Sequence, residues 1–120
     1  MLEILPQSQG KILGVRLTGK VSDSDYEEIF LPALQKLIDS YGKVRCVYFM
    51  DSGFEGWTLG AMWDDTKFGV NHKDDFEKCA IVGGPKWAQW GSKLVSHLIS
   101  VDLQTFSSDQ IDEAWNWIKT

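Results

Sequence analysis

The chain has 120 residues, of which 43% are hydrophobic and 24% are charged. This length suffices for one domain with its own core, and the composition excludes a disordered chain. The net charge of −5 repels nucleic acid and anionic lipid surfaces, so we expect neither as a partner.

Segments that would place the protein in a membrane or outside the cell are not evident in the sequence. No apolar run approaches the ~20 residues of a membrane span. The first residues carry no basic segment and no cleavage site. Cys46 and Cys79 each lie in an apolar run and are expected as buried, reduced thiols. These features predict a cytoplasmic protein without a membrane span.

The N-terminal half predicts a hairpin, a long helix and a buried strand. Residues 2–5 and 11–18 alternate in polarity around a turn, which is typical of two antiparallel strands. A helix capped by Ser22 or Ser24 follows, and its apolar stripe runs in phase to Tyr41. Pro32 predicts a kink near Leu31. Residues 44–50 are nearly all apolar and favour a central parallel strand.

The C-terminal half continues the alternation of strands and helices. A helix is expected to start near Trp57 or Thr58, with strands over 78–82 and 100–106 after it. Pro85 favours the first turn of another helix, and Ser107 or Ser108 can cap the last one. The order predicts an α/β fold with a five-stranded, mostly parallel sheet, an antiparallel first strand and four main helices.

Several short motifs resemble a known family over nearly the whole chain. They are Phe54-Glu55-Gly56-Trp57 with Leu59-Gly60-Ala61, Lys67-Phe68-Gly69, and Lys86-Trp87 after a Gly-Gly turn. Together with the element order, they resemble the SpoIIAA-like family of bacterial proteins, whose fold is similar to STAS domains. The resemblance implies strands that lie in sequence order. It extends distantly to CRAL-TRIO lipid carriers, which implies an apolar ligand as one candidate.

Ser52 matches part of a regulatory loop found in STAS-type antagonists of anti-sigma factors. Those proteins carry Asp-Ser-Ser-Gly or Asp-Ser-Thr-Gly, whereas this chain has Asp51-Ser52-Gly53, with one hydroxyl residue fewer. The resemblance therefore implies a second function, in which phosphorylation of Ser52 controls binding to a kinase-like anti-sigma factor.

Residues that could support catalysis or bind a metal are sparse. His72 and His97 do not form a metal-binding motif, and neither is paired in sequence with a nucleophile. The pairs Asp64-Asp65 and Asp74-Asp75 lack the spacing of calcium loops and are expected on solvated helix faces. We expect no enzyme activity, no metal and no cofactor.

The aromatic content is high, with six Trp, six Phe and three Tyr. Some of these residues, Tyr26, Phe30 and Trp115 among them, are expected in the core. Another set is predicted to line an apolar ligand pocket between the second and third helices: Trp57, Met62, Phe68, Trp87 and Trp90. The alternatives are an exposed tryptophan patch that binds a partner protein or a second copy of the chain, and plain packing of these side chains in the core.

The loops at the carboxyl ends of parallel strands are the usual binding edge of open α/β sheets. We therefore expect residues 51–57, 83–86 and 106–108 to gather at one edge of the sheet.

Overall fold

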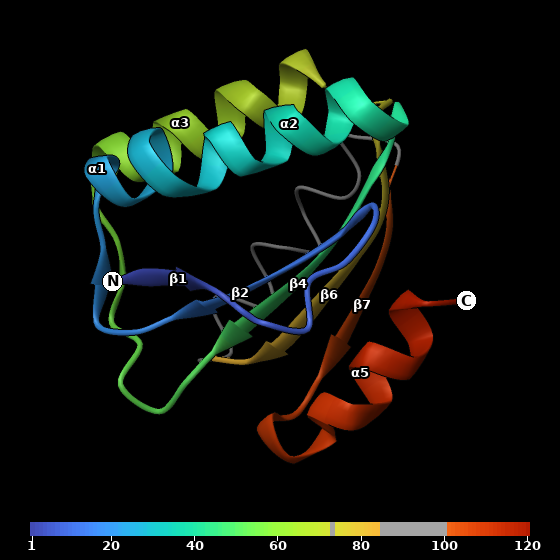
Figure 1. Ribbon diagram of the computed structural model, residues 1–120. Helices are drawn as coiled ribbons and strands as arrows, with labels where there is room; N and C mark the ends of the chain where they lie inside the picture. The colour runs from blue at the N-terminus through green and yellow to red at the C-terminus, as the bar shows by residue number, and fades with distance from the viewer. Residues whose placement is uncertain (73, 85–100) are drawn as a thin grey trace.

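The computed structural model describes residues 1–72, 74–84 and 101–120 (Figure 1). Five strands form one mixed sheet in the order β1-β2-β4-β6-β7. Their bounds are β1 Leu2–Ile4, β2 Ile12–Leu17, β4 Val44–Met50, β6 Phe76–Gly83 and β7 Asp102–Phe106. The first pair is antiparallel and the other pairs are parallel, so the predicted sheet and its spatial order are confirmed.

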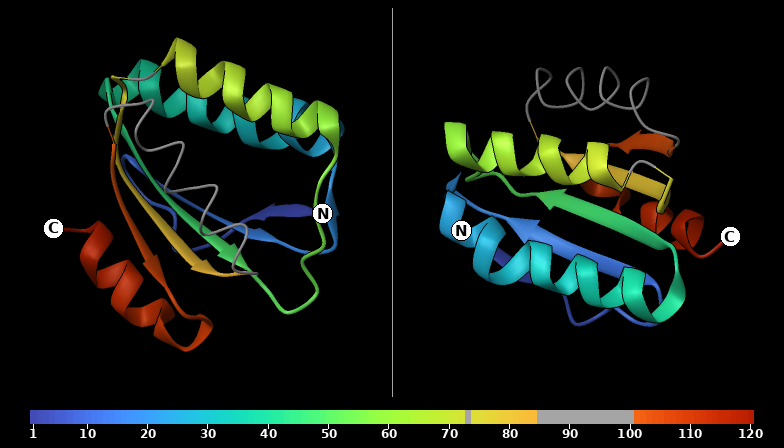
Figure 2. Two further views of the ribbon diagram at one scale, coloured as in Figure 1. Left: turned by 180° about the vertical axis from the view of Figure 1, so that it is seen from behind. Right: turned by 90° about the horizontal axis from the view of Figure 1, so that it is seen from above.

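Helices cover both faces of this sheet. One face carries α1 (Asp23–Asp25), the π-helical turn η1 (Tyr26–Phe30), α2 (Leu31–Tyr41) and α3 (Leu59–Asn71), while η2 (Ser108–Gln110) and α5 (Ile111–Ile118) lie against the other face (Figures 1 and 2). The helix predicted to begin at Pro85 lies outside the described residues.

Alternation along β2 explains how the two faces differ. Leu13, Val15 and Leu17 are buried in the core beneath α2 and α3. Gly14 points the opposite way, where a Cβ would come within 2.5 Å of the Trp115 ring. Trp115 of α5 therefore packs directly on the backbone of the sheet, and its predicted place in the core is confirmed.

The first helical segment runs without a break from α1 to the end of α2, as its continuous apolar stripe predicted. Ser22 and Asp25 form a reciprocal capping box at its start. Pro32, which was expected to kink the helix, lies in the first turn of α2. The π-helical turn precedes it, with the Leu31 N–H donating to the Tyr26 carbonyl. The wider turn accommodates the proline within a continuous helical segment.

A small second sheet was not predicted from the sequence. β3 (Lys20–Val21) pairs in parallel with β5 (Gly56–Trp57). Thr58 then caps α3 by accepting a hydrogen bond from the Ala61 N–H, which confirms the expected helix start. Two-residue strands leave no alternating pattern, so periodicity could not reveal them.

The core consists of one apolar cluster on each face of the sheet. Tyr26 and Phe30, predicted as core residues, are 1% and 0% exposed beneath the two long helices. The second cluster joins β4 and β6 to α5. Within the residues that the structure describes, no helix has the length and apolar character to cross a membrane.

Candidate ligand-binding site

A pocket of about 530 Å³ lies at the carboxyl edge of the parallel strands. It is lined by Phe49, Met50, Asp51, Ser52, Phe54, Gly83, Gly84, Ser107 and Ser108. These residues come from the ends of β4 and β6 and from the start of η2. The predicted meeting of the three loops at this edge is therefore confirmed for the described residues.

Two glycines and Met50 lie together in the lining of this pocket. Gly83 and Gly84 have φ values of +72° and +80°, a region that side chains with a Cβ rarely adopt. A Cβ on Gly83 would come within 2.7 Å of the Met50 carbonyl oxygen, and one on Gly84 within 2.4 Å of the Met50 sulfur. The double glycine thus lets the chain turn closely over Met50.

Asp51 holds the loop after β4 in place. Its carboxylate accepts hydrogen bonds from the Thr18 hydroxyl at 2.8 Å and from the Gly53 N–H at 2.9 Å, and it pairs with Arg16 at 2.9 Å. The Thr18 hydrogen bond is the largest of the effects that lower the pKa of Asp51. Because these partners engage both oxygens, Asp51 is a structural residue of the rim.

Ser52 and Ser108 supply hydroxyl groups at the mouth of the pocket. Both residues are exposed, and neither hydroxyl makes a hydrogen bond within the described part of the chain. Apolar side chains line the wall between them, from Phe49, Met50 and Phe54. This arrangement combines an apolar surface with a few free polar groups, which is typical of small-molecule sites.

Ser52 does not lie at the N-terminus of α3. The strand β5 and the cap residue Thr58 separate it from the first helical residue, Leu59. A phosphate on Ser52 would therefore be removed from the helix dipole, which acts mainly within the first turn. Phe54, which follows Ser52, packs edge-on against Trp57 with the ring centroids 5.0 Å apart.

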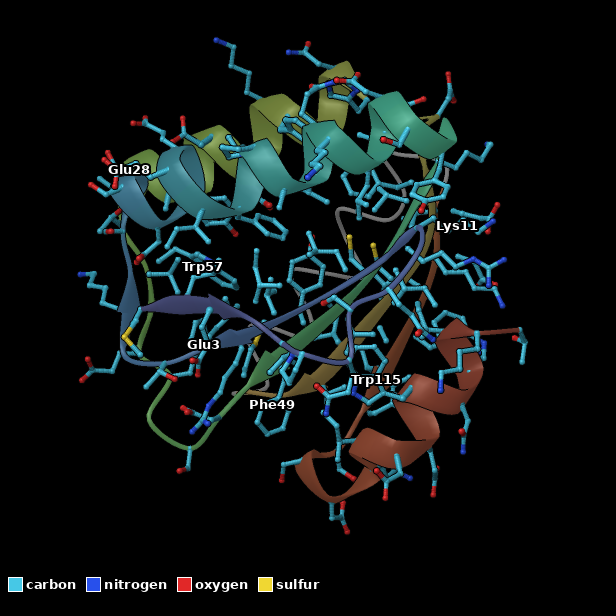
Figure 3. The ribbon with its side chains drawn as sticks, viewed as in Figure 1. Glu3, Lys11, Glu28, Phe49, Trp57 and Trp115 are labelled. Atoms are coloured by element: carbon cyan, nitrogen blue, oxygen red, sulfur yellow. The ribbon has the colours of Figure 1, made fainter. Side chains whose placement is uncertain are left out.

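The sequence-predicted aromatic cavity lies only partly within the described residues. Trp57 is half-buried on β5, whereas Phe68 packs on Phe76 near the other end of α3, with the ring centroids 6.2 Å apart. Trp57 precedes α3, and the nine helical steps from Leu59 to Phe68 rise by ~14 Å, so these two side chains do not meet directly. The side chain of Met62, and Trp87 and Trp90, lie outside the description. Figure 3 shows Trp57 beneath the helical layer.

Two titratable residues that the sequence did not pair, Tyr26 and Asp65, influence one another beside α3. Burial, and then the charge of the Asp65 carboxyl, raise the pKa of the Tyr26 phenol well above its usual value. Asp65 was expected on a solvated helix face, and the residue does keep exposed surface. Desolvation by the surrounding chain nevertheless raises the pKa of its carboxyl to about 6, and the hydrogen bond with Tyr26 opposes this increase. Asp65 is therefore exposed, as expected, but its carboxyl titrates with a raised pKa.

His72 has a structural partner at the end of α3. Its Nδ1 lies 2.8 Å from an Asp75 carboxylate oxygen, and its ring packs on Phe68. His72 precedes the amino end of β6, whereas Ser52 follows the carboxyl end of β4, so the two lie at opposite edges of the sheet. Across residues 1–72, 74–84 and 101–120, no three acidic, histidine or cysteine residues gather as a metal site.

Comparisons with known proteins agree with this architecture. A family model described as SpoIIAA-like matches residues 12–119. A crystal structure of an uncharacterized protein of the DUF3478 family from Shewanella loihica PV-4, with a SpoIIAA-like fold, is 24% identical and superimposes with a TM-score of 0.71. The alignment covers 98% of this chain and 93% of that one. No curated protein matches the sequence.

Proposed function

The chain belongs to the SpoIIAA-like family, and we propose that it is a non-enzymatic binding domain for a small, apolar, lipid-like ligand. The observation that carries this proposal is the pocket at the carboxyl edge of the sheet. Its volume of about 530 Å³ lies within the range of small-molecule sites. The opposite placement of Ser52 and His72 argues against a catalytic pair formed by these two residues.

The pocket lining suggests which part of the ligand lies where. Phe49, Met50 and Phe54 offer an apolar wall against which a hydrocarbon segment can be buried. The Ser52 and Ser108 hydroxyls can donate to or accept from one polar group at the mouth. A molecule with a short apolar chain and a single hydroxyl or carboxyl group would satisfy both surfaces.

A thermal-shift screen of medium-chain fatty acids, isoprenoid alcohols and mild detergents tests the proposal. A ligand that binds the folded state stabilises it by ~2.7 kcal/mol at a hundredfold excess over Kd. Ser108→Phe would fill the pocket mouth, while Ser40→Phe places the same side chain on an exposed part of α2. We expect ligands to raise the Tm of the wild type and of Ser40→Phe, and to leave Ser108→Phe unchanged. Equal shifts in all three proteins would locate binding elsewhere.

A phosphorylation-controlled regulator is the second candidate, because Ser52 is exposed at the pocket mouth. In this proposal, a kinase-like anti-sigma factor modifies Ser52 and binds the unmodified protein. A phosphate would lie near Asp51 and Glu55, whose charges oppose it. Mass spectrometry of protein purified from its own host would detect phosphate on Ser52. A fully unmodified Ser52 under every growth condition tested would argue against this candidate.

A further inference from the structure

Cys46 and Cys79 lie directly opposite one another on neighbouring strands. Cys46 on β4 and Cys79 on β6 are paired in register in the parallel ladder, so both side chains point to the same face. Both are free cysteines, and they are 0% and 6% exposed. The sequence placed each thiol in a strand, but the register that brings them together follows only from the fold.

The two thiols lie in the same apolar core cluster. A hydrogen bond to Cys79, followed by burial of the side chain, raises the pKa of the Cys46 thiol well above its usual value. Neighbouring strands are separated by ~4.8 Å, which lies within the ~4.4–6.8 Å between the Cα atoms of disulfide-bonded cysteines. The Cα spacing therefore already lies in the range found for disulfides.

We propose that Cys46 and Cys79 form a modification site, a buried dithiol that a peroxide converts into an intramolecular disulfide. In the first step the Cys79 sulfur attacks the peroxide. An S–O bond forms, the O–O bond breaks, and the thiol proton leaves with the departing oxygen as water or an alcohol. In the second step the Cys46 sulfur attacks the Cys79 sulfenic acid. The S–S bond forms, and the hydroxide leaving group takes the Cys46 proton to give water.

The structure assigns different roles to the two residues. Both thiols are buried, but Cys79 at 6% exposure is the more accessible of the two and meets the oxidant first, whereas Cys46 at 0% acts as the resolving thiol. Side chains on parallel neighbours hold their β-carbons farther apart than the ~3.8 Å mean of a disulfide, so the two strands must approach one another. A bond formed under such strain is readily reduced, which makes the site reversible.

Hydrogen peroxide added to the folded, reduced protein tests the proposal. After an acid quench, the protein is denatured and alkylated with N-ethylmaleimide, and its intact mass is measured. We expect an intact mass lower than that of the reduced protein by two hydrogen atoms, with no alkylation. After treatment with dithiothreitol, both thiols should be alkylated. Non-reducing peptide mapping should link the peptides that contain Cys46 and Cys79.

Cys46→Ala and Cys79→Ala are the matched controls, because alanine keeps a small apolar side chain at each position. The proposal expects a stable sulfenic acid in Cys46→Ala, and much slower oxidation of the remaining thiol in Cys79→Ala. Circular dichroism verifies that each variant is folded. If a variant is not folded, the wild-type protein alone decides the proposal. Two alkylated thiols after peroxide treatment of the wild type, or links only between different molecules, would overturn the proposal.

Discussion

Gly14 allows the Trp115 ring to lie against the sheet, which makes it a sensitive position. A Cβ at Gly14 would approach the ring to 2.5 Å, whereas a Cβ at Gly53 would meet only ordinary contacts, the nearest at 3.4 Å. Overpacking of this kind typically costs ~1–3 kcal/mol. We expect Gly14→Ala to lower the free energy of unfolding by that amount in urea titrations, and Gly53→Ala to change it little. A neutral Gly14→Ala would show that α5 can shift freely on the sheet.

Asp65 predicts how stability depends on pH. Because desolvation raises the pKa of Asp65 from 3.8 to about 6 in the folded state, the folded protein binds this proton more tightly than the unfolded chain. The contribution of Asp65 to stability is therefore present below pH 4 and is lost as the pH rises through 6. Partial exposure reduces the size of this effect.

The variant Asp65→Asn removes this titration and keeps a polar side chain of the same shape. From pH 4 to pH 7, we expect the free energy of unfolding of Asp65→Asn to increase relative to that of the wild type. Chemical denaturation at several pH values measures it. A difference that stays constant over this range would mean that the Asp65 carboxyl has its ordinary pKa.

At the scale of elements, Arg45 of β4 links β6 and the residue before β2 to the last helix. Its guanidinium pairs with Glu77 of β6, which also pairs with Lys11 at 2.9 Å. Arg45 donates a further hydrogen bond of 2.7 Å to the carbonyl of Ile118 at the end of α5. The Arg45 side chain is mostly buried, with 13% of it exposed. The position of α5 therefore depends partly on one side chain of β4.

The variant Arg45→Gln breaks these contacts. Hydrogen bonds to a charged group contribute ~1.5–3 kcal/mol, so we expect a loss of stability of that order and faster amide exchange in α5. Gln35→Ala is the control, because the Gln35–Asp39 hydrogen bond is exposed on α2 and contributes little. Similar stability losses in the two variants would contradict this role of Arg45.

The elements differ in how far the sequence could predict them. Long periodic segments such as α2 and β4 were predicted because burial on one or two faces leaves a repeating pattern. The π-helical turn before Pro32 was not predicted. The sequence shows that a proline interrupts the helical pattern, but not which backbone conformation accommodates it. The β3–β5 pair and the Cys46–Cys79 register depend on contacts between distant segments, which periodicity does not encode.

At the scale of the whole molecule, the sheet and its binding edge follow from the order of the elements. Parallel strands must place their carboxyl ends together, so the loops containing Ser52, Gly83 and Ser108 could be assigned to one edge in advance. The side chains that line the pocket could not be assigned, because Phe49 and Met50 belong to a strand that is nearly all apolar. The predicted aromatic cavity remains a prediction, since Trp87 and Trp90 lie outside the described residues.

The most direct test of ligand binding at this edge is a ¹H–¹⁵N spectrum of the labelled protein, titrated with the fatty acids and isoprenoid alcohols of the thermal-shift panel. Amide signals report binding residue by residue and do not depend on a change in stability. The account predicts saturable shifts for at least one compound, largest for Ser52, Gly84 and Ser108. Binding that leaves these three signals unmoved, or a panel in which no compound shifts any signal, would contradict it.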